Sequence, residues 1–277
     1  MSLENYTITI LGCGTIGTAM LSAMLKTKFE PYPSRIVCCT NSEKSALKLK
    51  ETYGEQIETS FGPANNAKAV GEANILILGC KPFLCEQIYN QVSSKLTGDQ
   101  IVISLLAGWS IEQLSGWSSN ARKIARVMTN TPAKFGAGIA VVSFSEECQE
   151  HEDLVMNLVG GVGTAIKLPE RNQDAATALV GSGVAFSLLF MEALAEGGIR
   201  MGIPSAVALE CAAKVMEGTA KMVSETGQHP GALKLATCTP GGTTIGGLLV
   251  MEDKNVRSGV SRAVEEATNI AARLGKK

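Results

Sequence analysis

The residues with the clearest chemical potential form one stretch near the end of the chain, Cys238-Thr239-Pro240-Gly241-Gly242-Thr243-Thr244. Pro240 fixes φ and lacks an N–H, which suits the entry to a helix. The two glycines let the backbone approach a ligand without interference from a Cβ atom. Thr243 and Thr244 then place two hydroxyls and two free N–H groups in the first helical turn, where a carboxylate or phosphate binds well. On its own, the pattern is equally typical of an ordinary capped turn.

A second motif lies at the start of the chain, where Gly12-Cys13-Gly14-Thr15-Ile16-Gly17 has the G-x-G-x-x-G spacing. It follows a β-branched segment at 6–11 and opens a helix-like segment at 16–28, which is the context that a dinucleotide-binding loop requires. The first glycine makes a tight turn, the second admits a pyrophosphate, and the third lets the helix pack closely on the strand. The motif therefore predicts a dinucleotide site.

The end of the second predicted strand bears on the choice of cofactor. NAD sites usually carry an Asp or Glu there, which binds the ribose 2′-hydroxyl. This chain has Asn41 and Ser42 instead, followed by Glu43 and Lys44. Uncharged polar groups and a lysine suit a 2′-phosphate better than a carboxylate does, because like charges repel. We therefore expect NADPH, and the lack of an arginine at this place leaves use of NADH open. Lys44 is as readily explained by a solvated helix face.

Further candidate residues follow other predicted strands, at the edge where open parallel sheets bind ligands. Lys81-Pro82 comes directly after one continuous apolar strand, and Ala107-Gly108 follows the next. The position of Lys81 favours a site role over that of an ordinary loop lysine. Asn130 follows a further strand, and it is equally consistent with a ligand contact and with turn formation.

Strand-like and helix-like segments alternate in the first part of the chain, which predicts an α/β fold with a doubly wound, mostly parallel sheet. The expected strands are 6–11, 35–40, 75–80, 100–105, 123–128 and 139–144, and the expected helices are 16–28, 42–53 and 146–159. From 172 to 226 the pattern is helical, punctuated by Gly197-Gly198 and Gly202-Ile203-Pro204, and a last helix at 256–274 ends at Gly275. We place a Rossmann domain at 1–167 and an all-α domain at 168–277, whose apolar surface is expected to pack on another subunit.

Composition narrows the class of protein. Of the 277 residues, 45% are hydrophobic, and the net charge of −1 gives no electrostatic support for nucleic-acid binding.

The eight cysteines form no C-x-x-C pair and no signal-peptide pattern is present, so reduced, buried, cytosolic thiols are expected. His151 and His229 lack ligand-spaced partners, so no zinc site is expected. The uncharged run 175–191 is short and interrupted for a membrane span and is expected to be a buried helix.

Together these motifs resemble pyrroline-5-carboxylate reductase, and the fungal form in particular. The most specific match is TPGGTTIGGL at 239–248, and the others are ILGCGTIG at 10–17, LGCKPF at 78–83, SLLAG at 104–108, RVMTNTPAKFG at 126–136 and DAATALVGSG at 174–183. The resemblance implies NAD(P)H-dependent reduction of 1-pyrroline-5-carboxylate to L-proline, the final step of proline biosynthesis. It also implies a cytoplasmic enzyme that forms homodimers through its helical domain and often assembles further into decamers.

The resemblance assigns roles to individual residues. Gly242, Thr243 and Thr244 would bind the substrate carboxylate and ring nitrogen, with Thr244 as the catalytic residue, and Glu170 would lie at the substrate pocket. The cofactor-binding residues would be Leu11, Gly12, Cys13, Gly14, Thr15, Ile16, Asn41, Ser42, Asn66, Cys80, Lys81, Pro82, Ala107 and Gly108. A protonated cyclic imine is strongly electrophilic, so hydride transfer to it would need neither a metal nor a strong enzymic acid.

The chain departs from the family at two places near the substrate pocket. Val184-Ala185-Phe186 stands where Pro and Tyr are common, and Lys234-Leu235-Ala236 stands where an acidic residue is frequent.

Two other functions stay open. Another two-domain reductase of the imine or hydroxyacid class would need an acid in the helical half, where Lys214 and Lys221 lie outside any motif. A regulatory protein that binds NADPH without turnover would not need the second anion site.

Overall fold

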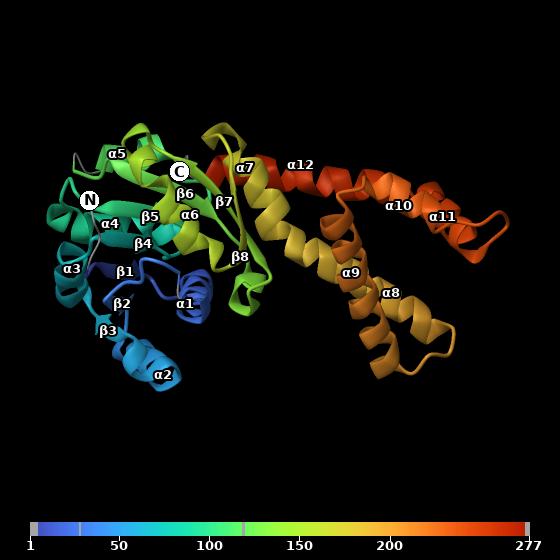
Figure 1. Cartoon of the computed structure of the whole chain (residues 1–277), viewed down its shortest axis with the longest axis horizontal. Helices are drawn as coiled ribbons and strands as arrows, with labels where there is room; N and C mark the ends of the chain where they lie inside the picture. The colour runs from blue at the N-terminus through green and yellow to red at the C-terminus, as the bar shows by residue number, and fades with distance from the viewer. Residues whose placement is uncertain (1–4, 28, 118–119, 275–277) are drawn as a thin grey trace. The chain divides into compact units, whose positions relative to one another are not determined.

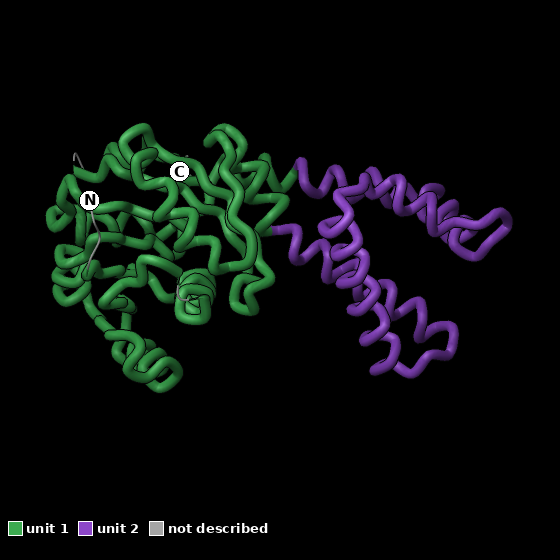
Figure 2. The backbone as a smooth tube through the Cα atoms, in the orientation of Figure 1, with its two compact units in different colours: residues 1–181, 266–277 green, residues 182–265 purple. Residues whose placement is uncertain are grey.

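The computed structural model describes residues 5–27, 29–117 and 120–274. The chain divides into two compact units, one of residues 1–181 and 266–277 and one of residues 182–265 (Figure 2). The predicted boundary at 167/168 lies before this division. The reason is that the segment after residue 170 packs on the sheet, where Ala176 and Val180 share a buried cluster with Met128 and Val141.

Within the described residues, the larger unit is built on an eight-stranded sheet with the order β3-β2-β1-β4-β5-β6-β7-β8 (Figure 1). The strands are β1 Thr7–Leu11, β2 Arg35–Thr40, β3 Glu58–Phe61, β4 Ile75–Leu78, β5 Ile101–Ser104, β6 Lys123–Met128, β7 Gly138–Phe144 and β8 Gly163–Lys167. Every neighbouring pair is parallel except β6 with β7. This arrangement confirms the predicted doubly wound, mostly parallel sheet.

Helices cover both faces of the sheet (Figure 1). They are α1 Thr15–Thr27, α2 Glu43–Tyr53, α3 Pro63–Gly71, α4 Cys85–Val92, α5 Ile111–Trp117, α6 Glu152–Gly160 and the short α7 Gln173–Ala176, which continues as a π-helix over Thr177–Ser182. One buried cluster joins the sheet to α1, α2 and α6, and a second joins its other face to α3, α4 and α5. Because both faces are covered, β4 is apolar and buried at all its positions.

The sequence patterns missed both edge strands. β3 (ETSF) and β8 (GTAIK) lie at the two ends of the sheet and are largely exposed, so neither carries the apolar run of a buried strand. The segment 146–159 also differs from the single helix predicted for it. Its first part, Glu146–His151, is a 3₁₀ helix that leads into α6.

Arg35, the first residue of β2, ties the edge strand β3 to the sheet. Its guanidinium donates to both carboxylate oxygens of Glu58 at 2.8 and 2.7 Å and to Glu72 at 2.7 Å. These hydrogen bonds lower the pKa of Glu58 and of Glu72 below the usual 4.5. The stabilisation that these hydrogen bonds give the fold is therefore present at pH values above the unfolded-state pKa of the two carboxyl groups. It is lost as the pH falls through their folded-state pKa.

We therefore expect Arg35→Gln to lower the urea midpoint of unfolding at pH 7 and to lower it less at pH 3. Urea titrations of both proteins at the two pH values would measure the difference. An equal loss at both pH values would show that the carboxylates are not responsible.

Helices are the only regular secondary structure among the described residues of the smaller unit, which confirms the predicted all-α part. Its helices are α8 Gly183–Arg200, α9 Ser205–Thr226, α10 Pro230–Ala236, α11 Thr243–Asp253 and the first part of α12 Val256–Leu274. α8 and α9 pack together through Ala195, Ala208 and Ala212. The predicted break at Gly197-Gly198 is wrong, because α8 continues through these residues. The predicted stop at Gly275 lies outside the described residues.

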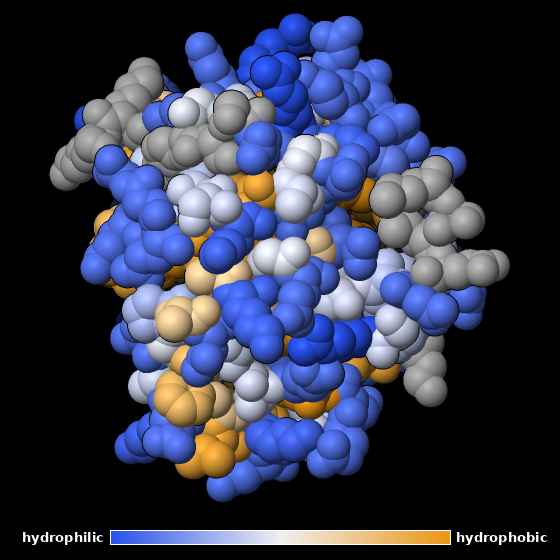
Figure 3. Space-filling model, turned by 90° about the vertical axis from the view of Figure 1, so that its left-hand side faces the viewer, coloured by the Kyte–Doolittle hydropathy of each residue, from blue (hydrophilic) through white to orange (hydrophobic). Residues whose placement is uncertain are grey.

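Much of α8 is apolar and exposed in a single chain, including Leu188, Leu189, Leu194 and Ile199. By length and composition alone, the helical stretch Glu170–Arg200 could cross a membrane, and only 17% of its most apolar window is buried. The predicted buried helix is therefore not buried within one chain. One face of the molecule, seen in Figure 3, is mainly hydrophilic with small scattered apolar patches.

Candidate dinucleotide site and anion-binding turn

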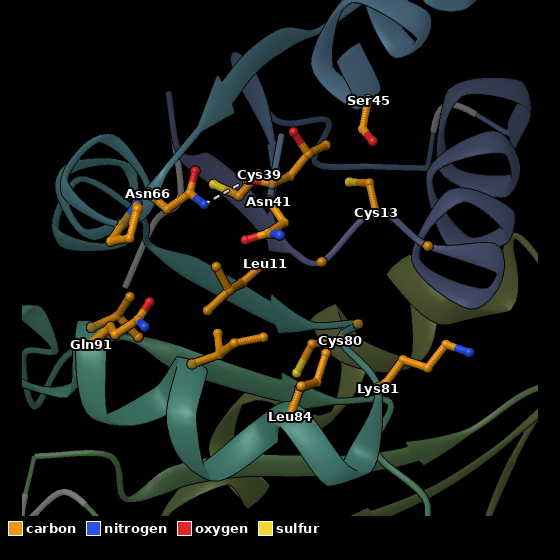
Figure 4. Close-up of a pocket in the computed structure, with 17 residues that line it drawn as sticks. Leu11, Cys13, Cys39, Asn41, Ser45, Asn66, Cys80, Lys81, Leu84 and Gln91 are labelled. Atoms are coloured by element: carbon orange, nitrogen blue, oxygen red, sulfur yellow. Dashed lines mark hydrogen bonds between the residues drawn. The ribbon is translucent and has the colours of Figure 1, made fainter. Parts of the chain in front are cut away.

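A hollow opens at the carboxyl ends of β1, β2 and β4, where the strand order changes direction between β1 and β4 (Figure 4). Its volume of about 270 Å³ is close to the lower limit of about 300 Å³ for small-molecule sites, so it suits part of a dinucleotide. The lining residues are Leu11, Gly12, Cys13, Gly14, Cys39, Thr40, Asn41, Ser45, Pro63, Asn66, Gly79, Cys80, Lys81, Leu84, Ile88, Gln91 and Val92.

The glycine loop forms one wall of this hollow, and its three glycines have different surroundings. Gly12 has φ +101°, and a Cβ atom there would lie 2.6 Å from the backbone nitrogen of Cys80. A Cβ atom on Gly17 would lie 2.4 Å from the carbonyl oxygen of Gly12. At Gly14 a Cβ atom would meet nothing within 4 Å. The first and third glycines are therefore required by the backbone, whereas the second borders open space.

The start of α1 supplies hydrogen-bond donors beside the hollow. The carbonyl of Gly14 accepts the N–H of Thr18 at 2.9 Å, so the helix begins at this point. The N–H groups of Thr15 and Ile16 precede any acceptor within the helix. Such a helix start favours an anion both through its free donors and through the helix dipole.

The lining is nearly uncharged. Burial raises the pKa of Cys39 to about 12, and a hydrogen bond with Cys38 together with burial raises the pKa of Cys13. The pKa of Cys80 is lowered, first because Cys85 donates a hydrogen bond to its sulfur. Among the described lining residues Lys81 is the one basic side chain, and none is a carboxylate. No carboxylate in the lining therefore repels a phosphate.

Asn41, Ser45 and Asn66 form the polar end of the hollow (Figure 4). Asn66 donates through Nδ2 to the carbonyl of Thr40 at 2.9 Å and accepts the Ser60 hydroxyl at 2.9 Å. Ser42 caps α2 by accepting the N–H of Ser45 and does not line the hollow. Ser45 lines it instead, and the Ser-x-x-Ser spacing at the start of a helix could have revealed this residue.

The structure brings together only part of the predicted cofactor set. The hollow includes Leu11, Gly12, Cys13, Gly14, Asn41, Asn66, Cys80 and Lys81, but not Thr15, Ile16, Ser42, Pro82, Ala107 or Gly108. Its opposite wall comes from α4 and the turn before it, and neither is among the predicted elements. Leu84, Ile88 and Gln91 recur there at helical spacing, and this periodicity was the available signal.

Ala107 and Gly108 lie in the turn between β5 and α5, where Gly108 has φ +81°. Trp109 donates through Nε1 to the carbonyl of Pro82 at 3.1 Å, which joins this turn to the one after β4. Glu170 lies in the larger unit, and its Oε1 accepts the N–H of Ile111 at 2.7 Å.

The second anion-binding candidate is the turn before α11, in the smaller unit. The carbonyl of Thr239 accepts the N–H of Gly242 at 3.0 Å, and Gly241 has φ +66°, as in a type II turn. Pro240 therefore occupies the second position of this turn and does not enter the helix, contrary to the sequence expectation. A Cβ atom on Gly242 would lie 2.4 Å from Oγ1 of Thr239 and 3.1 Å from its carbonyl oxygen, so a side chain there would require the Thr239 hydroxyl to move.

Gly242 is the N-cap of α11 and contributes no side-chain cap. The N–H groups of Thr243 and Thr244 therefore have no acceptor within the helix. Neither threonine hydroxyl has a hydrogen-bond partner among the described residues. The predicted pair of hydroxyls and free N–H groups is thus present at one helix start.

Three residues that the sequence left open or discounted have structural partners. Asn130 accepts the N–H of Ile139 through Oδ1 at 3.3 Å and donates to the carbonyl of Val180 at 3.3 Å, which favours its turn-forming role. His229 caps α10 through Nδ1, and the thiol of Cys238 donates to the carbonyl of Lys234. All eight cysteines are free thiols. Four of them are buried as expected, whereas Cys13, Cys80 and Cys238 are half-buried and Cys211 is exposed. Within the described ranges no three His, Cys, Asp or Glu residues form a metal-binding group.

Comparisons with known proteins agree with this arrangement. Residues 170–274 match the family model described as pyrroline-5-carboxylate reductase dimerisation, and residues 7–108 match the model described as NADP oxidoreductase coenzyme F420-dependent. A crystal structure of Plasmodium falciparum pyrroline carboxylate reductase with NADP bound shares the fold, with a TM-score of 0.86 and 22% identity over 99% of this chain and 100% of that one.

Two curated relatives from yeasts match over almost their whole length. The pyrroline-5-carboxylate reductase of Kluyveromyces lactis is 46% identical, with 99% of this chain and 100% of the relative covered. That of Schizosaccharomyces pombe is 35% identical, with 96% and 98% covered. Since identity at this level extends through both the glycine-loop unit and the helical unit, the chain belongs to the pyrroline-5-carboxylate reductase family.

Proposed function

We propose that this protein reduces 1-pyrroline-5-carboxylate to L-proline with NADPH, the final step of proline biosynthesis. The observation that carries the proposal is the presence of two separate helix starts with free N–H donors, at Gly14 and at Gly242. One suits the pyrophosphate of a dinucleotide, and the other suits the carboxylate of a small substrate. Family membership supports this pairing of ligands.

The residues of the hollow fit a phosphorylated dinucleotide. Gly14 leaves open space beside the free donors of α1, and the lining contains no carboxylate. Asn41 and Ser45 are polar and uncharged, so they can bind a 2′-phosphate without repulsion. NADPH supplies the hydride when it is bound. The remaining task for the protein is to hold and orient two ligands, which can lower a barrier by about 7–11 kcal/mol in favourable systems.

At the second site, the N–H groups of Thr243 and Thr244 hold the substrate carboxylate. The hydroxyl of Thr244 donates a hydrogen bond to the ring nitrogen as the imine becomes an amine. The protonated imine is electrophilic enough that no further acid is needed, which agrees with the structural roles of His229 and Cys238.

The proposal is tested by following cofactor absorbance with NADPH and, separately, with NADH. Rapid turnover with the pyrroline acid, and none with 2-oxo acids, is the expected result. Faster turnover with a 2-oxo acid would favour a hydroxyacid reductase. Tight NADPH binding without turnover of any imine would favour a regulatory protein.

A charge placed at the polar end of the hollow tests the cofactor preference. Asn41→Asp is expected to raise the KM for NADPH about ten-fold, on the order of 1.4 kcal/mol, because the carboxylate repels the 2′-phosphate. The KM for NADH should stay nearly constant, because NADH carries a hydroxyl at that position. Steady-state rates with both cofactors measure the ratio, and an equal change for both would remove Asn41 from the 2′-phosphate site.

The apolar exposed face of α8 supports a homodimer formed through the smaller unit. We further propose, as the resemblance implies, that such dimers assemble into a decamer and that the enzyme is cytoplasmic. Light scattering of the purified protein would measure the particle mass. A monomer at micromolar concentration would contradict the dimer.

A further inference from the structure

The first turn of α5 is held by side chains from two different parts of the chain. Ser110 and Gln113 form a reciprocal cap, in which the N–H of Gln113 donates to the Ser110 hydroxyl at 3.1 Å and the N–H of Ser110 donates to Oε1 of Gln113 at 2.9 Å. The N–H of Ile111 donates to Oε1 of Glu170 at 2.7 Å. A carboxylate at this position also interacts favourably with the positive end of the helix dipole.

Arg126 of β6 orients the Glu170 carboxylate. Its side chain is only 6% exposed, and its Nη1 and Nη2 lie 3.4 Å from Oε1 of Glu170 and 2.8 Å from Oδ1 of Asp174. In the described part of the chain its buried Nε has no partner. A buried charge is tolerated only when it is paired, so these two carboxylates keep Arg126 in place and are kept in place by it.

The segment that carries both carboxylates is itself attached to the sheet. Gln173 is fully buried and donates through Nε2 to the carbonyls of Arg126 at 3.3 Å and of Val141 at 3.1 Å. Glu170 thus extends from a rigid support to the start of α5.

The turn between β5 and α5 is held at two residues that lie two positions apart. Trp109 is bonded to the carbonyl of Pro82, and Ile111 is bonded to Glu170. Ala107 and Gly108 come directly before these anchors, and Gly108 has φ +81°. At the other end of the turn, the N–H of Leu105 donates to the carbonyl of Leu78 at 2.9 Å. A short turn held on both sides has little freedom to move.

We propose that Glu170 is a positioning residue, which fixes the Ala107-Gly108 turn through the N–H of Ile111. This inference rests on the proposed function, because the family resemblance implies that Ala107 and Gly108 are cofactor-binding residues of that function. It differs from the role that the resemblance implies for Glu170, because the carboxylate acts through α5 and does not touch the substrate.

Two substitutions separate these roles. Glu170→Gln keeps an oxygen that reaches Ile111 but loses the charge, whereas Glu170→Asp keeps the charge but is one methylene shorter. We expect kcat to fall about ten-fold in the Asp variant, the effect of removing one hydrogen bond at about 1.4 kcal/mol, and less than three-fold in the Gln variant. Glu112→Gln, in the first turn of the same helix, is the matched control and should leave kcat unchanged.

A spectroscopic measurement reports the turn without catalysis. The chain has two tryptophans, so a Trp117→Phe background leaves Trp109 as the only indole. Trp109 is 8% exposed, and its fluorescence should be quenched by acrylamide about twice as readily in the Asp variant as in its parent. The Gln and Glu112→Gln variants should resemble the parent.

Each outcome decides the inference. A larger loss of kcat in the Asp variant, together with stronger quenching, supports it. A larger loss in the Gln variant would mean that charge at the substrate matters, and would overturn it. Unchanged quenching in the Asp variant, or stronger quenching with unchanged kcat, would also overturn it. Turnover by the unsubstituted enzyme tests the proposed function separately, so the two failures are distinguishable.

Discussion

Gly14→Ala is expected to raise the Kd for NADPH about 100-fold, on the order of 2.7 kcal/mol, while leaving the fold intact. The added methyl group would meet no protein atom within 4 Å, so unfolding should be little affected. It would instead occupy the space beside the free N–H groups of α1, where the pyrophosphate is proposed to bind. Titration of NADPH fluorescence would measure the Kd, and urea unfolding would measure the stability.

Gly17→Ala provides the matched control, because it adds the same methyl group to the same loop. There the Cβ atom would lie 2.4 Å from the carbonyl oxygen of Gly12. A clash with backbone forces α1 away from β1, at a cost of about 1–3 kcal/mol or more. We therefore expect loss of stability in this variant and loss of affinity in the first. If Gly14→Ala bound NADPH normally, the proposed pyrophosphate position would be wrong.

Thr244→Ala is expected to lower kcat by about ten- to a hundred-fold, the effect of removing one hydrogen bond at the reacting centre. The Thr244 hydroxyl has no hydrogen-bond partner among the described residues, so the substitution breaks no hydrogen bond of the described fold. The N–H groups at the start of α11 are kept, so the KM for the substrate should change less than kcat. Steady-state kinetics with the pyrroline acid would measure both constants.

Two further variants complete this test. Thr244→Ser keeps the hydroxyl and should restore most of kcat. Thr219 and Thr244 both line a second cavity, which lies in the smaller unit and has a volume of about 310 Å³. Thr219→Ala removes a hydroxyl from this cavity that donates to the carbonyl of Val215. This control should retain full activity. An unaltered kcat in Thr244→Ala would refute its catalytic role.

The features that the sequence predicted well are local ones. β2 and β6 have the predicted bounds, because buried strands are rich in apolar residues. The roles of Gly12 and Gly17 followed from the spacing of the loop, and the structure supplies the backbone atoms that exclude a side chain there. The free N–H groups of Thr243 and Thr244 also followed from neighbouring residues alone.

The features that the sequence did not predict depend on contacts between distant segments. The edge strand β3 is polar, and its place is set by pairing with β2 and by the bonds from Arg35. The α4 wall of the hollow adjoins the glycine loop only after β4 pairs with β1. Glu170 meets Ile111 across 59 residues of sequence, and no local pattern records that contact.

The sequence by itself thus determined the fold class, the family and the two helix starts that suit anions, because each is written in residues that are neighbours along the chain. The tertiary structure alone decided which of the predicted cofactor residues share one hollow, where the compact units divide, and what Glu170 contacts. These depend on strand order and side-chain packing, which bring together residues whose separation in the chain leaves no periodic or spacing signal.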